Sequence, residues 1–568
     1  MIRGAALLLV LFFAQDDGAI KLKWKVAKSD FVRYKAWNYT PPDEKPNATP
    51  SQRVAGIFGY EIKDDTRYEA QPKDDRDVPL QLCFTLPKPL AVGATTDFSV
   101  DFDAFNYGAI TVKGTTTRNK NATIQGAGCV EFVHKAKLSA KGKGTGTQID
   151  GGAFDAVVHF DPAIGVVRRV RFSWSWSYSY ENADKKKQTY TQAQNEIMEY
   201  VKTLQVRTAE FEMEVNKAID KGIEAIWKVY DDKEGHWAVM GEHKTGQTAL
   251  ALLAILKGTL DRSDARLRKA LDWMIAQPLE QTYDVGLCLM AMEAFYSPKD
   301  PTTRFKPGEI ADKEIVKNIE KPHLAWATSA AKWLLANQQP SGMWHYPMKD
   351  IASADYSNTQ YGVLGLLAAA RIGVGVDLNA VMKALRSYLD SQMKTGTKTE
   401  LLLTEQNPPK GTKPTTSGVV AEVRGWGYGA GAGTTGYGSM TLGGIGSLTI
   451  LDSILRRAGA KYTKDEAGKV IAARRDGWAW MQSNWTVKSN AAYGSSWYCY
   501  YLYAMERAAM LMGVATIGGH DWYWEGAEIL ISNQSDAGTW WNSSVYDTCF
   551  CVLFLKRATF NVATPTGK

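Results

Sequence analysis

The sequence predicts a chain of two parts, an N-terminal antiparallel β domain followed by an all-α (α/α)6 toroid of six helical hairpins. Polar and apolar residues alternate with a period of two over residues 20 to about 185, which is typical of half-buried strands. Helical periodicity begins near residue 205 and lasts to about residue 560. A spacing of Gln, Gly and Trp recurs after helical patterns, which indicates an internal structural repeat. Its full copies are Gln338, Gly342 and Trp344, then Gln534, Gly538 and Trp540.

The first 18 residues have the pattern of a secretory signal peptide. A short basic start precedes an apolar run from Ala5 to Ala14, and Gln15-Asp16-Asp17 ends it. This run is too short to span a bilayer. We therefore expect an exported chain, periplasmic or extracellular, with no membrane span after cleavage. An ordinary buried N-terminal strand is the alternative. The mild net charge of +7 gives no reason to expect nucleic acid as a partner.

Residues 19–182 are expected to form a β-sandwich or an open barrel. The stretch from Val167 to Trp176 shows the alternation most clearly, and turns rich in Gly, Thr, Asn and Lys separate such stretches. The polar segment 183–204 is expected to be a linker and the start of a helix. Cys83 and Cys129 both lie in strand-like sequence. A disulfide between them fits an oxidising compartment.

Residues 205–560 pair an amphipathic helix with a more apolar helix six times. A helix that is apolar on all sides, such as Ala249 to Leu256, must be buried on all sides. Such helices suit an inner ring with amphipathic partners outside, and six pairs close a ring. An insertion is expected at 395–436 and a tail at 561–568. The expected pairs are 208–230 with 245–257, 266–277 with 285–296, 327–337 with 359–372, 379–393 with 437–457, 468–481 with 496–512, and 522–532 with 546–557.

The Gln-x-x-x-Gly-x-Trp spacing resembles the repeat of the terpene cyclase (squalene cyclase-like) and protein prenyltransferase superfamily over about residues 205 to 560. The resemblance implies that the Gln ties the end of an outer helix and that the Trp packs on the next turn. The string from Asp355 to Gly362 also resembles uncharacterised exported bacterial members. The Asp-x-Asp-Asp acid of squalene-type cyclases is absent from the sequence, and the nearest string is Asp101-Phe102-Asp103-Ala104. Cyclase chemistry by that route is therefore not expected.

A zinc site is implied by the same resemblance. Protein prenyltransferases hold zinc with an Asp-x-Cys pair at the start of an inner helix and a later His. Asp547-Thr548-Cys549 matches the pair, and ring closure brings His243 and Cys499 to neighbouring helix starts. Asp547, Cys549, His243 and Cys499 would suit a tetrahedral zinc ion. A Cys499–Cys549 disulfide and plain packing of both thiols are the alternatives.

Polar residues precede the inner helices, and the starts of these helices face one mouth of a toroid. Asp284, Asp355 and Asp547 are the candidate catalytic residues, as a general acid and base if burial separates their pKa values. Helix capping is the alternative role of each. The Gly-rich insertion carries Trp and Tyr that could cover the mouth. The candidate ligand-binding residues are His243, Lys244, Asn358, Gln360, Trp426, Tyr428, Ser439 and Trp497.

Three functions fit this organisation. The preferred one is the binding of an apolar ligand or a protein partner at the ring mouth, because no complete catalytic motif is present. The second is an enzyme on lipids or terpenoids, a cyclase or transferase. The third is a glycan-active enzyme, because (α/α)6 toroids with aromatic clefts also host lyases and hydrolases. A ring filled by side chains favours the first function, a closed apolar chamber the second, and a polar groove lined by Trp and carboxylates the third.

Overall fold

The structure is a computed structural model, in which the chain divides into two compact units, Met1–Phe211 and Glu212–Lys568. It describes residues 19–559 except for 20–21, 23–24, 26–29, 48–50, 57–59, 65–66, 71–81, 105–107, 141–147, 182–184, 206–207, 238–243, 260, 299–310, 347–353, 407–418, 430–434, 461–462 and 542–543. The expected signal peptide and the tail at 561–568 lie outside the described residues.

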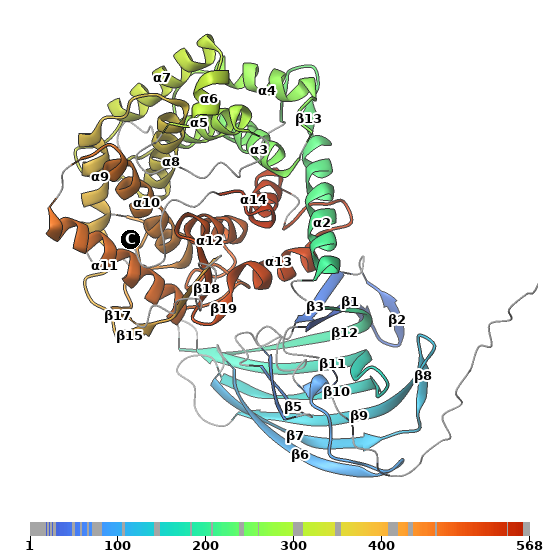
Figure 1. Ribbon diagram of the computed structural model, residues 1–568. Coiled ribbons are helices and arrows are strands. Elements are labelled where there is room, and N and C mark those ends of the chain that lie inside the picture. The colour runs from blue at the N-terminus through green and yellow to red at the C-terminus, as the bar shows by residue number, and fades with distance from the viewer. Residues whose placement is uncertain are drawn as a thin grey trace, which may run out of the picture. The chain divides into compact units, whose positions relative to one another are not determined.

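The first unit is built on an antiparallel sheet of ten strands (Figure 1). The strand order is β2-β1-β12-β11-β10-β9-β7-β6, with β3 beside β1 and β8 beside β9. Most neighbours are consecutive in the chain, so most connections are short. The strands are β1 (Asp30–Thr40), β2 (Asp43–Pro46), β3 (Ser51–Gly56), β6 (Thr95–Ala104), β7 (Gly108–Arg118), β8 (Ala122–Ile124), β9 (Ala127–Ala140), β10 (Gln148–Asp161), β11 (Val166–Glu181) and β12 (Lys187–Gln205), and a separate hairpin pairs β4 (Tyr60–Asp64) with β5 (Arg67–Ala70).

One face of this sheet carries the apolar core of the first unit. The ring of Phe154 on β10 lies 6.5 Å from that of Phe172 and 5.9 Å from that of Trp174, both on β11, and all three side chains are buried. The alternation of the sequence therefore places its apolar residues on one side, as half-buried strands require. The prediction of antiparallel β structure in this part of the chain is confirmed, although its main strands share one sheet rather than two.

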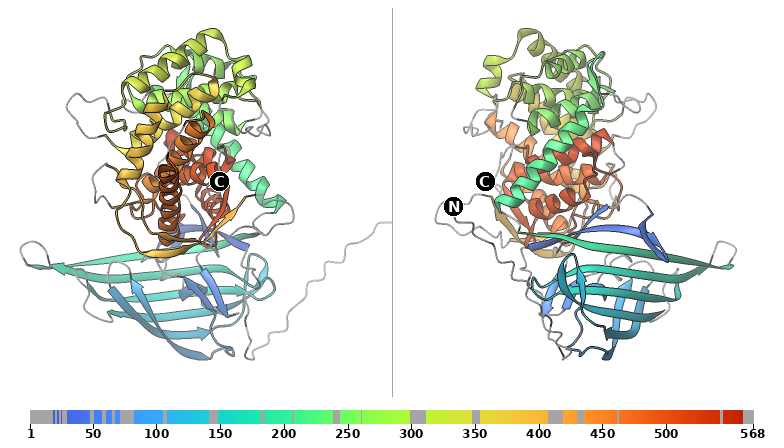
Figure 2. Two further views of the ribbon diagram at one scale, coloured as in Figure 1. Left: turned by 60° about the vertical axis from the view of Figure 1, so that its left-hand side comes forward. Right: turned by 90° about the vertical axis from the view of Figure 1, so that its right-hand side faces the viewer.

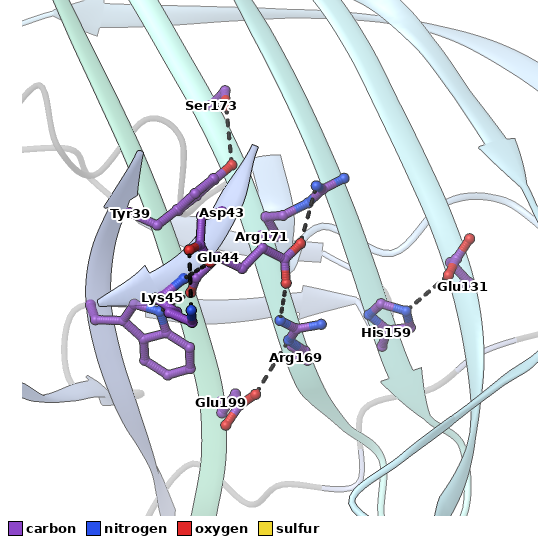
Figure 3. A network of polar contacts seen from close by, with 11 residues as sticks. Tyr39, Asp43, Glu44, Lys45, Glu131, His159, Arg169, Arg171, Ser173 and Glu199 are labelled. Carbon is purple, nitrogen blue, oxygen red and sulfur yellow. Dashed lines mark hydrogen bonds and ion pairs between the residues drawn. The ribbon is translucent and has the colours of Figure 1, made fainter. Parts of the chain in front are cut away.

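The opposite face of the sheet carries a polar network, which Figure 3 shows at close range. Arg169 on β11 pairs with Glu44 of β2 at 2.6 Å and with Glu199 of β12 at 3.3 Å. His159 on β10 lies directly opposite Glu131 on β9, and its Nε2 is 2.9 Å from a carboxylate oxygen. Cross-strand pairs of this kind contribute little stability each, but they favour one register.

The expected linker at 183–204 is wrong, because most of it is strand β12. This strand pairs with β11 on one side and with β1 on the other. Lys185 and Lys186 of the Lys-rich run lie in the connection between β11 and β12, and Lys187 begins β12, so the run marks no domain boundary. The sequence misleads here because the exposed half of β12, with residues such as Thr191 and Gln192, is as polar as a linker. Pairing with β1, far away in the chain, decides the structure.

The second unit consists of helices that alternate between a partly exposed and a buried member. The partly exposed helices are α2 (Ala209–Trp227), α4 (Ala265–Ile275), α7 (Lys321–Ala336), α9 (Leu378–Ser391), α11 (Lys464–Ser483) and α13 (Trp522–Asn533). The buried helices are α3 (Lys244–Gly258), α5 (Thr282–Tyr296), α8 (Tyr356–Ile372), α10 (Gly438–Arg457), α12 (Tyr498–Met512) and α14 (Val545–Lys556). A short helix, α6 (Lys313–Asn318), precedes α7.

The buried helices pack against one another in chain order. Each contacts the next, from α3 through α5, α8, α10 and α12 to α14, and α14 contacts α3, so the cycle of contacts closes. Figures 1 and 2 show the partner helices α4, α7, α9 and α11 on the outside of this group. Helix α10 is also long and apolar enough to span a membrane, but 94% of the apolar window is buried inside the protein, as for a core helix.

The glutamines of the repeat join neighbouring outer helices. Gln338 Nε2 donates to the carbonyl oxygens of Gly342 and of Ala380 on α9, both at 2.9 Å. Gln534 Nε2 donates to Gly538 O at 3.0 Å and to Ala218 O on α2 at 2.8 Å. The bond to Ala218 ties the last outer helix to the first.

A third copy of the repeat escapes the sequence pattern. Gln392 Nε2 donates to Arg424 O at 3.0 Å and to Ala473 O on α11 at 2.8 Å, as the other two glutamines do to their partners. Trp426 is the tryptophan of this copy, and its indole donates to Tyr388 O at 2.8 Å. The insertion between Gln392 and Arg424 hides the spacing.

The repeat glycine and tryptophan form a close turn at the helix end. Gly342 has φ +88°, and a Cβ there would lie 2.4 Å from the carbonyl oxygen of Lys383 on α9. Only glycine fits such a position. The indole of Trp344 donates to Leu334 O at 2.8 Å and covers Gly362 of α8. The sequence also holds two degenerate copies of the spacing, Asp231-x-x-x-Gly235-x-Trp237 and Gln277-x-x-x-Gln281-x-Tyr283. Trp237 keeps the indole bond, to Ile226 O, whereas the side chain of Gln277 donates to Trp273 O, one turn earlier.

The expected insertion at 395–436 contains strands. β15 (Lys398–Leu401) pairs with β17 (Val419–Glu422), and β16 (Leu403–Glu405) joins β18 (Val514–Ile517) and β19 (His520–Asp521). A small hairpin of β13 (Tyr230–Asp231) and β14 (His236–Trp237) follows α2. All six cysteines are free and buried, so the structure forms neither the Cys83–Cys129 nor the Cys499–Cys549 disulfide.

Candidate functional site

The starts of the buried helices lie together at one end of the second unit. Direct contacts link successive starts. Tyr283 of α5 donates a hydrogen bond to Ser357 of α8. The residue before α8, Asp355, forms a β-bridge with Gly429 in the segment that leads into α10. The thiol of Cys499 on α12 lies beside Asp547 on α14. We call this end the mouth.

Large aromatic side chains are exposed around the mouth. Tyr428 is 45% exposed, Tyr493 48%, Trp497 61% and Trp541 46%. They lie in the segments that lead into α10, α12 and α14. Among the described residues of the second unit, no other Trp, Tyr or Phe is exposed. Exposed apolar surface that gathers in one place marks an interaction site more often than scattered residues do.

Both exposed tryptophans have a strained backbone. Trp497 has φ +55° and Trp541 has φ +51°, in the left-handed region that bulky residues rarely adopt. Ala492, in the same loop as Trp497, has φ +58°. Such strain persists only where the surroundings hold it, and it concentrates at functional sites. Here Asn490 holds the loop, because its side chain donates to Ser496 O and to Ser439 Oγ, each at 3.1 Å.

A buried carboxyl group lies beneath this rim. Asp355 is 3% exposed and caps α8, accepting hydrogen bonds from the backbone and side-chain nitrogens of Asn358 at 2.7 and 2.9 Å. Burial raises the pKa of Asp355, and the Asn358 bonds oppose this only in part. Burial and the charge of Asp355 raise the pKa of Tyr428, and burial, Tyr493 and Asp355 raise that of Tyr437. Protonated phenols and a carboxyl that holds its proton more tightly than usual therefore share the mouth.

The other two candidate carboxyls sit at the starts of α5, which contacts α8, and of α14, which contacts α12 and α3. Asp284 lies in the first turn of α5, where its Oδ1 is so close to α3 that only glycine fits at Gly246. Asp547 accepts the hydroxyl of Ser544 at 2.6 Å, and Ser544, not Asp547, caps α14. Burial raises the pKa of Asp547. Asp355 therefore caps its helix, whereas Asp284 and Asp547 lie in first turns, where the helix dipole favours an acid.

The expected zinc ligands are brought together only in part. Cys499 contacts Asp547, but Cys551 rather than Cys549 is its sulfur neighbour. Burial raises the pKa of Cys549, which opposes the thiolate form that zinc needs. Across the residues that the structure describes, no group of three or more Cys, His, Asp and Glu could hold a metal ion. His243 lies outside those residues.

The remaining predicted ligand residues fall into three groups. Tyr428 and Trp497 are exposed at the mouth, as is Lys244 at the start of α3. Trp426 is fully buried and serves the repeat instead. Asn358, Ser439 and Gln360 are buried, and their polar groups bond to Asp355, Asn490 and Arg507 respectively.

Trp541, Tyr493 and Tyr437 were not predicted from the sequence to lie at a site, and Tyr283 was predicted only as the aromatic residue of a degenerate repeat copy. Trp541 follows the repeat residue Trp540 directly. A second Trp that has no role in the repeat is the sequence feature that could have indicated a binding residue there. Tyr493 and Tyr437 stack at 4.4 Å between ring centroids with planes 16° apart. Their partnership depends on two loops far apart in the chain, so no local pattern reveals it.

Aromatic side chains pack between the buried helices in the halves nearer the mouth. Tyr361, Tyr500 and Tyr503 are buried there with Phe550, and Phe550 lies 5.5 Å from both Tyr500 and Tyr503. Tyr361 stacks on Tyr500 at 6.3 Å. Burial raises the pKa of Tyr361 to about 12, so its phenol stays protonated. A closed apolar chamber is therefore not formed by these residues.

Comparison with known proteins assigns no family. No protein-family model matches the chain, and no curated protein matches it. A solved structure of an inactive variant of the α-1,6-mannanase GH76A of Salegentibacter sp. HEL1_6, in complex with α-1,6-mannotriose, aligns with 61% of this chain and 98% of its own. The identity is 10% and the TM-score 0.36, which is too low to support an argument about fold or function. The resemblance to the terpene cyclase and prenyltransferase superfamily finds no support in these comparisons.

Proposed function

We propose that the second unit is a closed (α/α)6 toroid that binds a carbohydrate chain across its mouth. The observation that carries this proposal is the pair of exposed, strained tryptophans, Trp497 and Trp541, beside exposed Tyr428 and Tyr493. The closed cycle of contacts among the buried helices and the Gln534 bond to Ala218 support the toroid.

Carbohydrate fits the chemistry of the mouth better than an apolar ligand does. A sugar ring has apolar C–H faces and a rim of hydroxyl groups. Exposed indole and phenol rings offer flat surfaces for the faces, and carboxyl, hydroxyl and amide groups between them accept and donate hydrogen bonds. An apolar ligand at the mouth needs an enclosed apolar space there, whereas buried Tyr361, Tyr500 and Phe550 lie in the first two turns of α8, α12 and α14 and fill that space. The preferred expectation of an apolar ligand is therefore replaced by the glycan alternative.

The test is binding of the full chain to a panel of soluble polysaccharides by affinity electrophoresis. The double variant Trp497→Ala, Trp541→Ala should lose retardation by at least one polysaccharide that retards the wild type. Tyr190→Ala is the matched control, because Tyr190 is similarly exposed, at 44%, but lies on β12. Retardation of wild type and double variant to the same extent, or of neither, would refute the proposal.

Hydrolysis of the bound glycan is a second candidate function, which the burial of Asp355 favours. A glycosidase needs one carboxylic acid with a raised pKa to protonate the leaving oxygen and a second carboxylate as base or nucleophile. Asp355 fits the first role, and Asp284 and Asp547 are the candidates for the second. Asp355→Asn should then abolish release of reducing ends and leave retardation in the gel intact. If the wild type releases no reducing ends from any polysaccharide that it binds, hydrolysis is refuted and only the binding function stands.

An exported chain would meet such polysaccharides outside the cytoplasm, in agreement with the signal-peptide pattern of residues 1–18.

A further inference from the structure

A cavity lies towards the other ends of the buried helices. Its volume is about 60 Å³, and it is lined by residues late in α3, α5, α8, α12 and α14 and by Ala558 and Thr559 after α14. Eight of its fourteen lining residues are apolar, among them Leu253, Leu364 and Leu553. The charged residues on its wall are Lys257, Glu293, Arg371 and Arg507.

Arg507 on this wall carries a charge that no carboxylate balances directly. The side chain is 5% exposed, and no ion pair joins it to an acid among the described residues. Its Nη2 donates to Gln360 Oε1 at 3.1 Å, while its Nη1 is buried without a hydrogen-bond partner. The Tyr500 hydroxyl lies near Arg507 but makes no hydrogen bond of standard geometry. A buried charge and an unmade hydrogen bond are both costly.

The surroundings of Arg507 offset only part of this cost. Its guanidinium lies 4.4 Å from the centroid of Tyr503 and 5.6 Å from that of Tyr361, so cation–π attraction contributes. Ring faces leave Nη1 of Arg507 without a hydrogen-bond acceptor. The neighbouring Glu506 is engaged elsewhere, because its two oxygens accept the backbone nitrogen and the hydroxyl of Thr559, each at 2.8 Å.

The other cations of the cavity have a simpler explanation. Arg371 pairs with Glu293 at 2.6 Å and with Asp312 at 3.2 Å. Arg371 and Lys257 also lie in the last turns of α8 and α3, where positive charge offsets the helix dipole. Arg507 lies five residues before Met512, the end of α12, so this explanation does not extend to it.

We propose that this cavity binds a small organic carboxylate, whose anionic group bonds to Arg507 and whose short apolar tail contacts the leucines. A carboxylate suits the planar guanidinium and supplies the missing acceptor. The apolar wall favours an organic acid over an inorganic oxyanion, which would need polar partners on every side. The volume holds about four to six water-sized positions. Acids of the size of propionate or butyrate match this. The site is independent of the mouth and of the function proposed for it.

The test is isothermal titration of the full chain with sodium butyrate, with sodium phosphate as the comparison anion. We expect saturable binding of butyrate, one per chain, and at least tenfold weaker binding of phosphate. Arg507→Met should abolish butyrate binding. Ala368→Leu, which fills the cavity and keeps every charge, should weaken it at least tenfold. Arg386→Met removes a surface arginine paired with Glu466 and should change nothing.

The outcomes separate cleanly. If Arg507→Met does not fold by circular dichroism, Ala368→Leu decides. Absence of saturable butyrate binding by the folded wild type overturns the proposal, and so does unchanged binding by Ala368→Leu. Equal binding of phosphate and butyrate would overturn the assignment to an organic acid.

Discussion

Replacing Trp497 by glycine and by alanine separates its structural cost from its role in binding. Trp497 is 61% exposed and has φ +55°. Both variants lose the same modest packing. Alanine keeps the left-handed strain, which amounts to about 1 to 2 kcal/mol for an L-residue, whereas glycine relieves it. The greater freedom of glycine in the unfolded chain offsets this advantage by about 0.5 to 1 kcal/mol. Trp497→Gly should therefore be more stable than Trp497→Ala by about 1 kcal/mol.

The same two variants should bind carbohydrate equally poorly. Loss of one aromatic platform contributes about 1 to 2 kcal/mol, which is roughly a tenfold loss of affinity. Stability is measured by urea unfolding followed by tryptophan fluorescence, and affinity by electrophoresis in gels of graded polysaccharide content. Equal stability of the two variants would show that the backbone at Trp497 is not strained. Wild-type affinity of both variants would refute the role of Trp497 in binding.

Three further predictions follow from the described contacts. Burial raises the pKa of Glu506 from its ordinary 4.5 to about 7, so the stability that its protonation supplies is complete below about pH 4.5 and is lost as the pH rises through about 7. Glu506→Gln should remove this loss and so raise the free energy of unfolding above pH 7 by at most about 3 kcal/mol. The denaturation midpoint of this variant should then no longer fall between pH 5 and 8. Gly538→Ala places a Cβ 2.3 Å from Lys221 O at φ +88° and should lower the free energy of unfolding by about 2 to 5 kcal/mol. The control Gly459→Ala, at φ +69° with nothing within 4 Å of the Cβ, should lower it by only about 1 to 2 kcal/mol. Equal losses of stability in thermal melts of the two variants would contradict the close contact between Gly538 and α2. If zinc is bound at Asp547, native mass spectrometry should show one zinc per chain that Asp547→Ala loses, and a native mass equal to that of the bare chain removes the zinc site.

The repeat was predictable from the sequence because its parts are local. Gln338, Gly342 and Trp344 act within one turn, so their spacing survives in the chain. The copy at Gln392 was hidden because the insertion separates it from Trp426, although the hydrogen bonds are the same. The repeat is therefore defined by its hydrogen bonds, and the sequence spacing reveals them only where no insertion separates the residues.

Long-range pairing explains what the sequence could not indicate. The sequence predicts a linker at β12 because the exposed half of this strand is polar, and because one of its two partners, β1, lies about 160 residues away and leaves no local pattern. The acids at the mouth were placed by their positions before or within the first turns of buried helices, and Asp355 also caps its helix, as such positions favour. The aromatic rim was found only in part, since the exposure of Trp541 and the stacking of Tyr493 on Tyr437 depend on how separate loops meet.

The central claim is that carbohydrate binds across the mouth, and oxidative footprinting by mass spectrometry tests it most directly. The full chain is oxidised with and without a polysaccharide that retards it, and modification of each exposed aromatic residue is compared. The account predicts protection of Trp497, Trp541, Tyr428 and Tyr493, and unchanged oxidation of Tyr190. Protection that spares both tryptophans of the mouth would contradict it.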